Sequence, residues 1–234
     1  MKREIDMREI SDGKLYGPND LVKADCGDCH GCFACCQKMG QSIVLDPLDI
    51  YRLTKYLNVS FEQLLAEKIE LNVVDGLILP NLKMCGTEER CAFLDENGRC
   101  GIHQIRPGIC RLFPLGRYYN NGSFQYFLQV HECKKENRTK VKVKKWIDTP
   151  DLKRNEKYIL EWHDFVIELQ EQLMKMTDES YSKKINLFVL QSFFVEPYDM
   201  QTDFYIQFEN RLAKDKNRDS TIAKKDKNND KKHM

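Results

Sequence analysis

The chain has 234 residues, enough for one domain of ordinary size plus an appendage, and its formal net charge is +1. Hydrophobic residues make up 41% and charged residues 31%, as in a soluble globular protein, and the near-neutral balance gives no overall field that favours nucleic acid or membranes. The N-terminal sequence MKREIDMREI lacks the apolar stretch of a signal peptide, and no window approaches the ~18 consecutive apolar residues of a membrane helix. We therefore expect a cytoplasmic protein.

Two helices are predicted after a cysteine-dense run at 26–36. Asp46 is a good N-cap for a helix that has Pro47 at its first position. Ser60 and Gln63 form a capping-box pattern for a second helix that ends near residue 68.

Three hairpins are predicted next, each around a pair or triplet of turn residues. The turns are Asp75-Gly76, Glu96-Asn97-Gly98 and Asn121-Gly122, within the segments 73–78, 91–102 and 118–130. Short helices followed by short hairpins indicate an α+β fold.

The C-terminal third is expected to be mainly helical. The segment 134–145 carries seven basic residues and one acid, and we interpret it as a solvated edge strand in preference to a nucleic-acid strip. Thr149-Pro150 opens a long helix whose apolar residues recur at helical spacing as far as Met176. An apolar run at 185–195 and a final helix at 202–212 follow.

These patterns predict a small irregular metal-stabilised domain of short helices and hairpins with a helical C-terminal extension. The predicted parts are an N-terminal arm (1–20), a cysteine-cluster metal-binding domain (21–145), the helical extension (146–213) and a disordered charged tail (214–234).

The ten cysteines carry the chemistry. Cytosolic thiols are kept reduced, so their density indicates metal or redox chemistry rather than a disulfide framework.

The first group of cysteines, at 26–36, offers two sets of ligands. Cys26, Cys29, Cys32 and Cys36 have the C-x2-C-x2-C-x3-C spacing of bacterial ferredoxins, without the proline that usually follows. The other set is Cys29, Cys32, Cys35 and Cys36, although adjacent Cys35 and Cys36 are not expected to bind the same metal ion.

A second group, more loosely spaced, must be assembled by the hairpins. Its members are Cys85, Cys91, Cys100, Cys110 and Cys133. Together the two groups could supply two four-cysteine sites. His103 and His131 lie near cysteines, but each is expected to be an ordinary hydrogen-bonded or exposed histidine rather than a ligand.

Several motifs resemble the YkgJ-type CxxCxxCC family, also described as zinc- or iron-chelating proteins. They are Cys29-His30-Gly31-Cys32-Phe33-Ala34-Cys35-Cys36, Cys91-Ala92-Phe93-Leu94, Gly98-Arg99-Cys100-Gly101-Ile102-His103 and Arg106-Pro107-Gly108-Ile109-Cys110-Arg111-Leu112-Phe113-Pro114. The resemblance covers roughly residues 26–133 and implies a cysteine-bound metal centre. The ligands it implies are Cys29, Cys32, Cys35, Cys36, Cys91, Cys100, Cys110 and Cys133. Cys26 and Cys85 depart from the family pattern and could be spare or could replace a ligand, and Cys26 is kept as a candidate metal ligand.

The resemblance and the residues leave three functions open. The first is a redox protein with one or two Fe–S clusters, an oxidoreductase whose redox partner is unknown. The second is a flagellin-type lysine N-methylase, which would use S-adenosylmethionine, although the sequence has no GxGxxG loop. The third is a zinc-stabilised interaction module without catalysis. Iron is favoured over zinc by the ferredoxin-like run. Arg106 and Arg111 are expected to neutralise thiolate charge beside the metal.

Overall fold

The computed structural model describes residues 6–27, 32–175 and 178–214. The helical segments are α1 (Met7–Ile10), the 3-10 turn η1 (Ala34–Cys36), α2 (Pro47–Leu57), α3 (Phe61–Glu67), the 3-10 turn η2 (His103–Ile105), α4 (Gly108–Leu112), α5 (Val143–Ile147), α6 (Leu152–Lys175), α7 (Glu179–Leu190), the π-helical turn η3 (Gln191–Val195) and a last helix over 204–214. The strands are β1 (Leu21–Asp25), β2 (Ile69–Val74), β3 (Leu77–Leu82), β4 (Met84–Cys85), β5 (Arg90–Cys91), β6 (Leu115–Asn120), β7 (Ser123–Leu128) and β8 (Thr139–Lys142).

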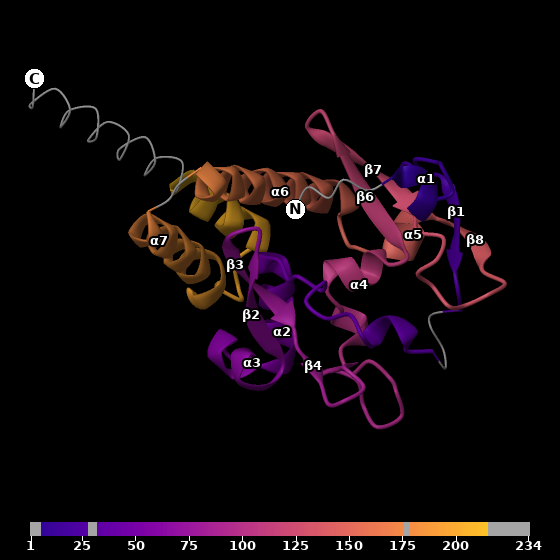
Figure 1. The fold of residues 1–234 in the computed structure, drawn as a ribbon, viewed down its shortest axis with the longest axis horizontal. Coiled ribbons are helices and arrows are strands. Elements are labelled where there is room, and N and C mark those ends of the chain that lie inside the picture. The colour runs from indigo at the N-terminus through magenta and orange to yellow at the C-terminus, as the bar shows by residue number, and fades with distance from the viewer. Residues whose placement is uncertain (1–5, 28–31, 176–177, 215–234) are drawn as a thin grey trace, which may run out of the picture.

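The strands form antiparallel pairs rather than one large sheet. β2 pairs with β3, β4 with β5, β6 with β7, and β1 with β8. Long α6 runs along one side of the molecule, with the β2–β3 hairpin near one end and the β6–β7 hairpin near the other (Figure 1). The α+β class and the helical C-terminal part are therefore confirmed. Among the described helices, none is both long and apolar enough to cross a membrane.

Local signals account for the elements near the cysteines. Asp46 and Asp49 form a capping box at the start of α2, and Ser60 and Gln63 form one at the start of α3. Asp75 and Gly76 adopt φ values of 50° and 87°, the left-handed region that a tight two-residue hairpin turn requires. Both predicted helices and the hairpin at 73–78 are confirmed.

The predicted hairpin at 91–102 is present in a shorter form. Leu94 and Cys100 form an antiparallel bridge across the turn, with two backbone hydrogen bonds of 2.8 Å beside it, whereas Cys91 pairs with Met84 of β4. Hydrogen bonds within the turn, including those that the backbone N–H groups of Asn97 and Arg99 donate to the Asp95 carboxylate, close it as a loop. Because the Asp95 side chain accepts from these amides, they take no part in the backbone hydrogen-bond ladder of a longer hairpin.

The other predictions hold with shifted limits. The hairpin around Asn121-Gly122 is β6–β7, in which Gly116 lies opposite Phe127 and a Cβ on Gly116 would collide with the Phe127 ring. The basic segment 134–145 contains a strand, but only Thr139–Lys142, and its partner β1 was not predicted. The last helix occupies 204–214 instead of 202–212.

The main core joins the cysteine-bearing region to the C-terminal helices. It combines buried residues between 43 and 102 with residues between 158 and 212. The backbone N–H of Leu48 in α2 donates to the Tyr158 hydroxyl in α6 at 3.0 Å, and the Gln170 amide donates to the Val74 carbonyl at 2.8 Å. A smaller core underlies β1, β6–β7 and α5. The predicted boundaries at 20, 145 and 213 stay predictions, and the tail 215–234 lies outside the described residues.

Candidate metal centre

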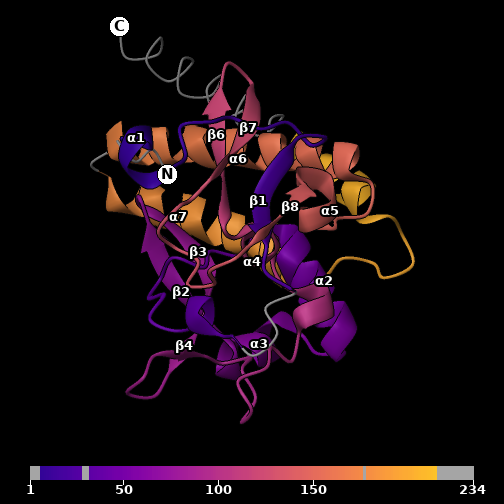
Figure 2. The ribbon, with the colours of Figure 1, turned by 90° about the vertical axis from the view of Figure 1, so that its right-hand side faces the viewer.

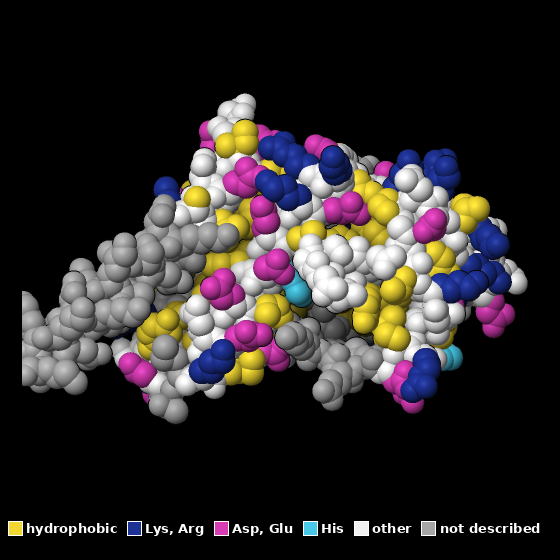
Figure 3. All heavy atoms as spheres, turned by 90° about the horizontal axis from the view of Figure 1, so that it is seen from above, with side chains coloured by type: hydrophobic (Ala, Val, Ile, Leu, Met, Phe, Trp, Pro, Cys, Tyr) yellow, Lys and Arg dark blue, Asp and Glu magenta, His cyan; other side chains and the backbone are white. Residues whose placement is uncertain are grey.

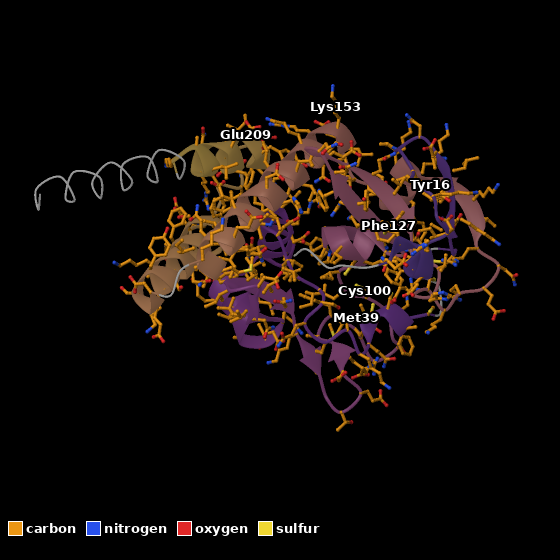
Figure 4. All side chains as sticks on the ribbon, turned by 45° about the horizontal axis from the view of Figure 1, so that its top comes forward. Tyr16, Met39, Cys100, Phe127, Lys153 and Glu209 are labelled. Carbon is orange, nitrogen blue, oxygen red and sulfur yellow. The ribbon has the colours of Figure 1, made fainter. Side chains whose placement is uncertain are left out.

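A cavity of about 510 Å³ opens where the cysteine-bearing segments meet. Its wall includes the side chains of Cys32, Cys35, Cys36, Cys91, Cys100 and Cys110. Much of the remaining wall is apolar and includes Met39, which lies beside Cys100 in Figure 4. Six thiols from parts of the chain up to 78 positions apart (110 − 32) thus surround one space.

Backbone hydrogen bonds bring these segments together. The Lys38 amide after η1 donates to the Glu89 carbonyl at 2.9 Å, and Gln37 bridges to Arg90. This holds the first cysteine group against β5, which carries Cys91. The bridge between Leu94 and Cys100 then turns Cys100 back toward Cys91.

Asp49 fixes the fourth segment. One oxygen of its buried carboxylate accepts a hydrogen bond from the Gly108 amide at 2.8 Å, at the start of α4. The other accepts from the Asp46 amide at 3.2 Å. The start of α2 is thereby tied to the helix that carries Cys110. Sequence reasoning missed this role of Asp49, because no local pattern links two residues 59 positions apart.

The thiols influence one another. The Cys36 thiol hydrogen-bonds to Cys35, which lowers the pKa of Cys35 to about 7, and the Arg106 guanidinium acts in the same direction. This contact, with burial, raises the pKa of Cys36. Burial also raises the pKa of Cys91, Cys100 and Cys110. Most of these thiols would therefore give up a proton when they ligate a metal.

A second, smaller pocket of about 20 Å³ adjoins the first. Cys26, Cys32, Cys35 and Cys133 line it, together with Lys134 and Lys135. Cys32 and Cys35 belong to both walls, whereas Cys36 lines only the larger cavity. The structure therefore groups the predicted ligands around two adjoining spaces that share two thiols.

The family model for CxxCxxCC, described as "putative zinc- or iron-chelating domain", matches residues 28–146, just over half of the chain. The chain belongs to the CxxCxxCC family. No curated protein and no solved structure matches it significantly. The matched segment starts within the first cysteine run and ends at Trp146, whose side chain lines both pockets.

The donor set of this CxxCxxCC domain fits a zinc or iron centre. Thiolates are soft ligands that hold both zinc and Fe–S clusters. Within the described ranges, no three cysteine, histidine or acidic side chains already converge on one metal position. The thiols surround a space rather than a point, so binding would draw them inward.

Two predicted cysteines differ from the rest. Cys29 lies outside the described residues, so its place in the CxxCxxCC domain stays a prediction. Cys85 is exposed and is not part of the wall that the described residues form around either pocket.

Arg106 and Arg111 have different roles in the structure. Arg106 lines the large cavity and contacts the His103 ring, and its charge helps to lower the pKa of Cys35. At Cys100 the same charge opposes the larger effect of burial, which raises the pKa of that thiol. Arg111 does not take that role. Its buried guanidinium donates to the backbone carbonyls of Arg106, Gln104 and Asp148, so it fixes the loop around α4 instead.

Proposed function

We propose that the CxxCxxCC domain holds an Fe–S cluster and that this protein transfers electrons. The observation that carries the proposal is the way the thiols are spread around one cavity. A structural zinc ion draws four ligands to one point, whereas the six thiols line a cavity of about 510 Å³ and no three donors among the described residues converge on one position. An Fe–S cluster also takes four cysteines, but it holds them around a body of several atoms, which suits thiols that surround a space.

The wall of the cavity suits this chemistry. When bound, an Fe–S cluster accepts and donates single electrons, at a potential that depends on charge, hydrogen bonds and solvent exposure. Apolar side chains such as Ile43, Leu94 and Ile102 line the cavity and keep water away from the sulfurs. Arg106 places a positive charge beside the thiolates, which favours the more negative, reduced state.

The test is anaerobic purification followed by a visible absorption spectrum and analysis of iron, acid-labile sulfide and zinc in the same sample. We expect brown protein that contains both iron and sulfide. Cys110→Ser removes a thiol from the cavity and should lose most of the iron and colour. Cys85→Ser is the matched control, because Cys85 is exposed, and it should keep both.

A colourless protein with stoichiometric zinc would reject electron transfer and leave a zinc-stabilised interaction module. Equal iron loss in the two serine variants would reject the cavity as the site. Far-UV circular dichroism of each variant separates loss of the centre from loss of the fold.

A separate experiment tests the alternative that the protein is a lysine N-methylase. Titration with S-adenosylmethionine in a calorimeter should give no heat of binding if the protein is an electron carrier. Saturable heat would favour the methylase instead.

A further inference from the structure

We propose that the outer face of the β1–β8 ribbon is the docking surface for an acidic redox protein. The proposal rests on the electron-transfer function proposed above and names the kind of partner. The basic face is defined by the exposed lysines Lys23, Lys134, Lys140, Lys142, Lys144 and Lys145.

Strand geometry places Lys23, Lys140 and Lys142 on one side, and the other lysines belong to the segments that flank β8. Val22 and Ala24 of β1 are buried in the smaller core, so the side chains that alternate with them, Leu21 and Lys23, point outward. On β8, Val141 packs against the same core, and Lys140 and Lys142 are exposed. β1 and β8 lie side by side at one end of the molecule, next to α5 (Figure 2). Figure 3 shows Lys and Arg side chains gathered at that end.

The positive charge is concentrated in one part of the chain. The whole chain has a net charge of +1, yet the segment 134–145 holds seven basic residues against the single acid Glu136. Asp25 and Glu132 also lie nearby, and Asp25 is hydrogen-bonded to Thr139 at 3.3 Å. A concentrated positive field on an otherwise balanced protein attracts a negatively charged surface and orients it.

The basic face adjoins the thiols at the more accessible side of the centre. Lys134 and Lys135 line the small pocket together with Cys26 and Cys133, and both cysteines are partly exposed, whereas Cys91 is buried. A partner seated on the face would therefore lie next to Cys26 and Cys133. One electron would pass from the reduced cluster of the partner to the oxidised cluster of this chain, with no proton or bond transferred.

The composition of the face favours a protein over a nucleic acid. Its exposed cations are lysines, which act as point charges, whereas the planar fork of arginine is the better match for phosphates. Leu21 lies among them with 56% of its surface exposed and, in the register, opposite Lys142. An exposed apolar side chain bordered by charged side chains is typical of a protein–protein contact.

The experiment uses the full chain, purified anaerobically, and an acidic plant-type [2Fe–2S] ferredoxin as the probe. Electrostatic docking requires only opposite charge, so the probe need not be the natural partner. The test variant is the triple Lys23→Glu, Lys140→Glu, Lys142→Glu. Its matched control, Lys175→Glu, Lys183→Glu, Lys184→Glu, makes the same charge change at exposed lysines of α6 and α7. α7 lies on the opposite side of the molecule from β1 and β8 (Figure 1).

We expect calorimetry to detect salt-dependent binding of the ferredoxin to the wild type. At low ionic strength the test triple should bind about ten-fold or more weakly and be reduced correspondingly more slowly in stopped flow, and the difference should fade at high salt. The control triple should stay much closer to the wild type. Equal binding by both triples, or no binding by the wild type, would overturn the proposal. Tighter binding of a single-stranded 20-mer DNA or of anionic vesicles than of ferredoxin would also overturn it.

Calorimetry does not depend on the cluster. If the wild type is colourless but binds ferredoxin through the basic face, electron transfer fails while the docking surface stands. If it is brown and does not bind, only the docking surface fails.

Discussion

The carboxylate of Asp49 accepts a hydrogen bond from the backbone amide of Gly108 at 2.8 Å, across 59 positions of the chain. It thereby ties the start of α2 to the short helix that carries Cys110. This buried contact therefore helps to fix where Cys110 stands in the cavity wall.

Asp49→Ala should therefore destabilise the protein and loosen the centre. The substitution removes the acceptor for two amides, that of Gly108 and that of Asp46, and the second of these is half of the capping box of α2. We expect the free energy of unfolding in urea to fall by about 2–4 kcal/mol. The exposed Glu168→Ala in α6 is the control and should change it by less than about 0.5 kcal/mol. Similar values for the two variants would contradict the role assigned to Asp49.

Arg111 should act on stability rather than on the charge of the centre. Arg111→Met keeps the length of the side chain but removes the donors to the carbonyls of Arg106, Gln104 and Asp148. We expect a loss of about 2–4 kcal/mol in the free energy of unfolding. Arg154→Met, which breaks the surface ion pair with Asp203, should cost only about 0–1 kcal/mol. Equal losses would show that the buried carbonyls do not need the guanidinium.

The two tryptophans report on the centre from different distances. Trp146 lines both pockets, whereas Trp162 packs among Phe165, Phe193 and Phe208 in the main core. If the domain holds the proposed Fe–S cluster, its anaerobic removal should raise the fluorescence of Trp162→Phe, which keeps Trp146, because such a cluster quenches nearby indoles. Trp146→Phe, which keeps Trp162, should respond less. A larger response from Trp146→Phe would place the cluster away from the pockets.

His163 should make stability depend on pH. Its ring stacks on Tyr119 with centroids 3.7 Å apart, and burial lowers the pKa of His163 despite the neighbouring Asp164. Because the folded state prefers the neutral ring, its contribution is complete above about pH 6.5 and is lost as the pH falls below that value. We expect His163→Phe, which keeps the stack, to lose less stability than the wild type between pH 7.5 and pH 5 in urea unfolding. A parallel loss in both proteins would contradict the lowered pKa, and an NMR titration of the His163 ring measures it directly.

Patterns among near neighbours in the chain were enough to predict several elements. Caps at Asp46 and Ser60, and the turn at Asp75-Gly76, need only residues within a few positions, so they predicted α2, α3 and the β2–β3 hairpin. The motifs of the two cysteine groups also sufficed to indicate the CxxCxxCC family, which the family model confirms.

The remaining features of the fold and the site depend on contacts between distant segments, so local patterns did not predict them. Cys91 pairs with Met84 of β4, so the hairpin around Glu96-Asn97-Gly98 is shorter than predicted. Arg111 turns to backbone carbonyls because burial leaves its donors no water to bind. Burial and loop closure are set by the whole packed chain, and no local pattern encodes which thiols face one cavity.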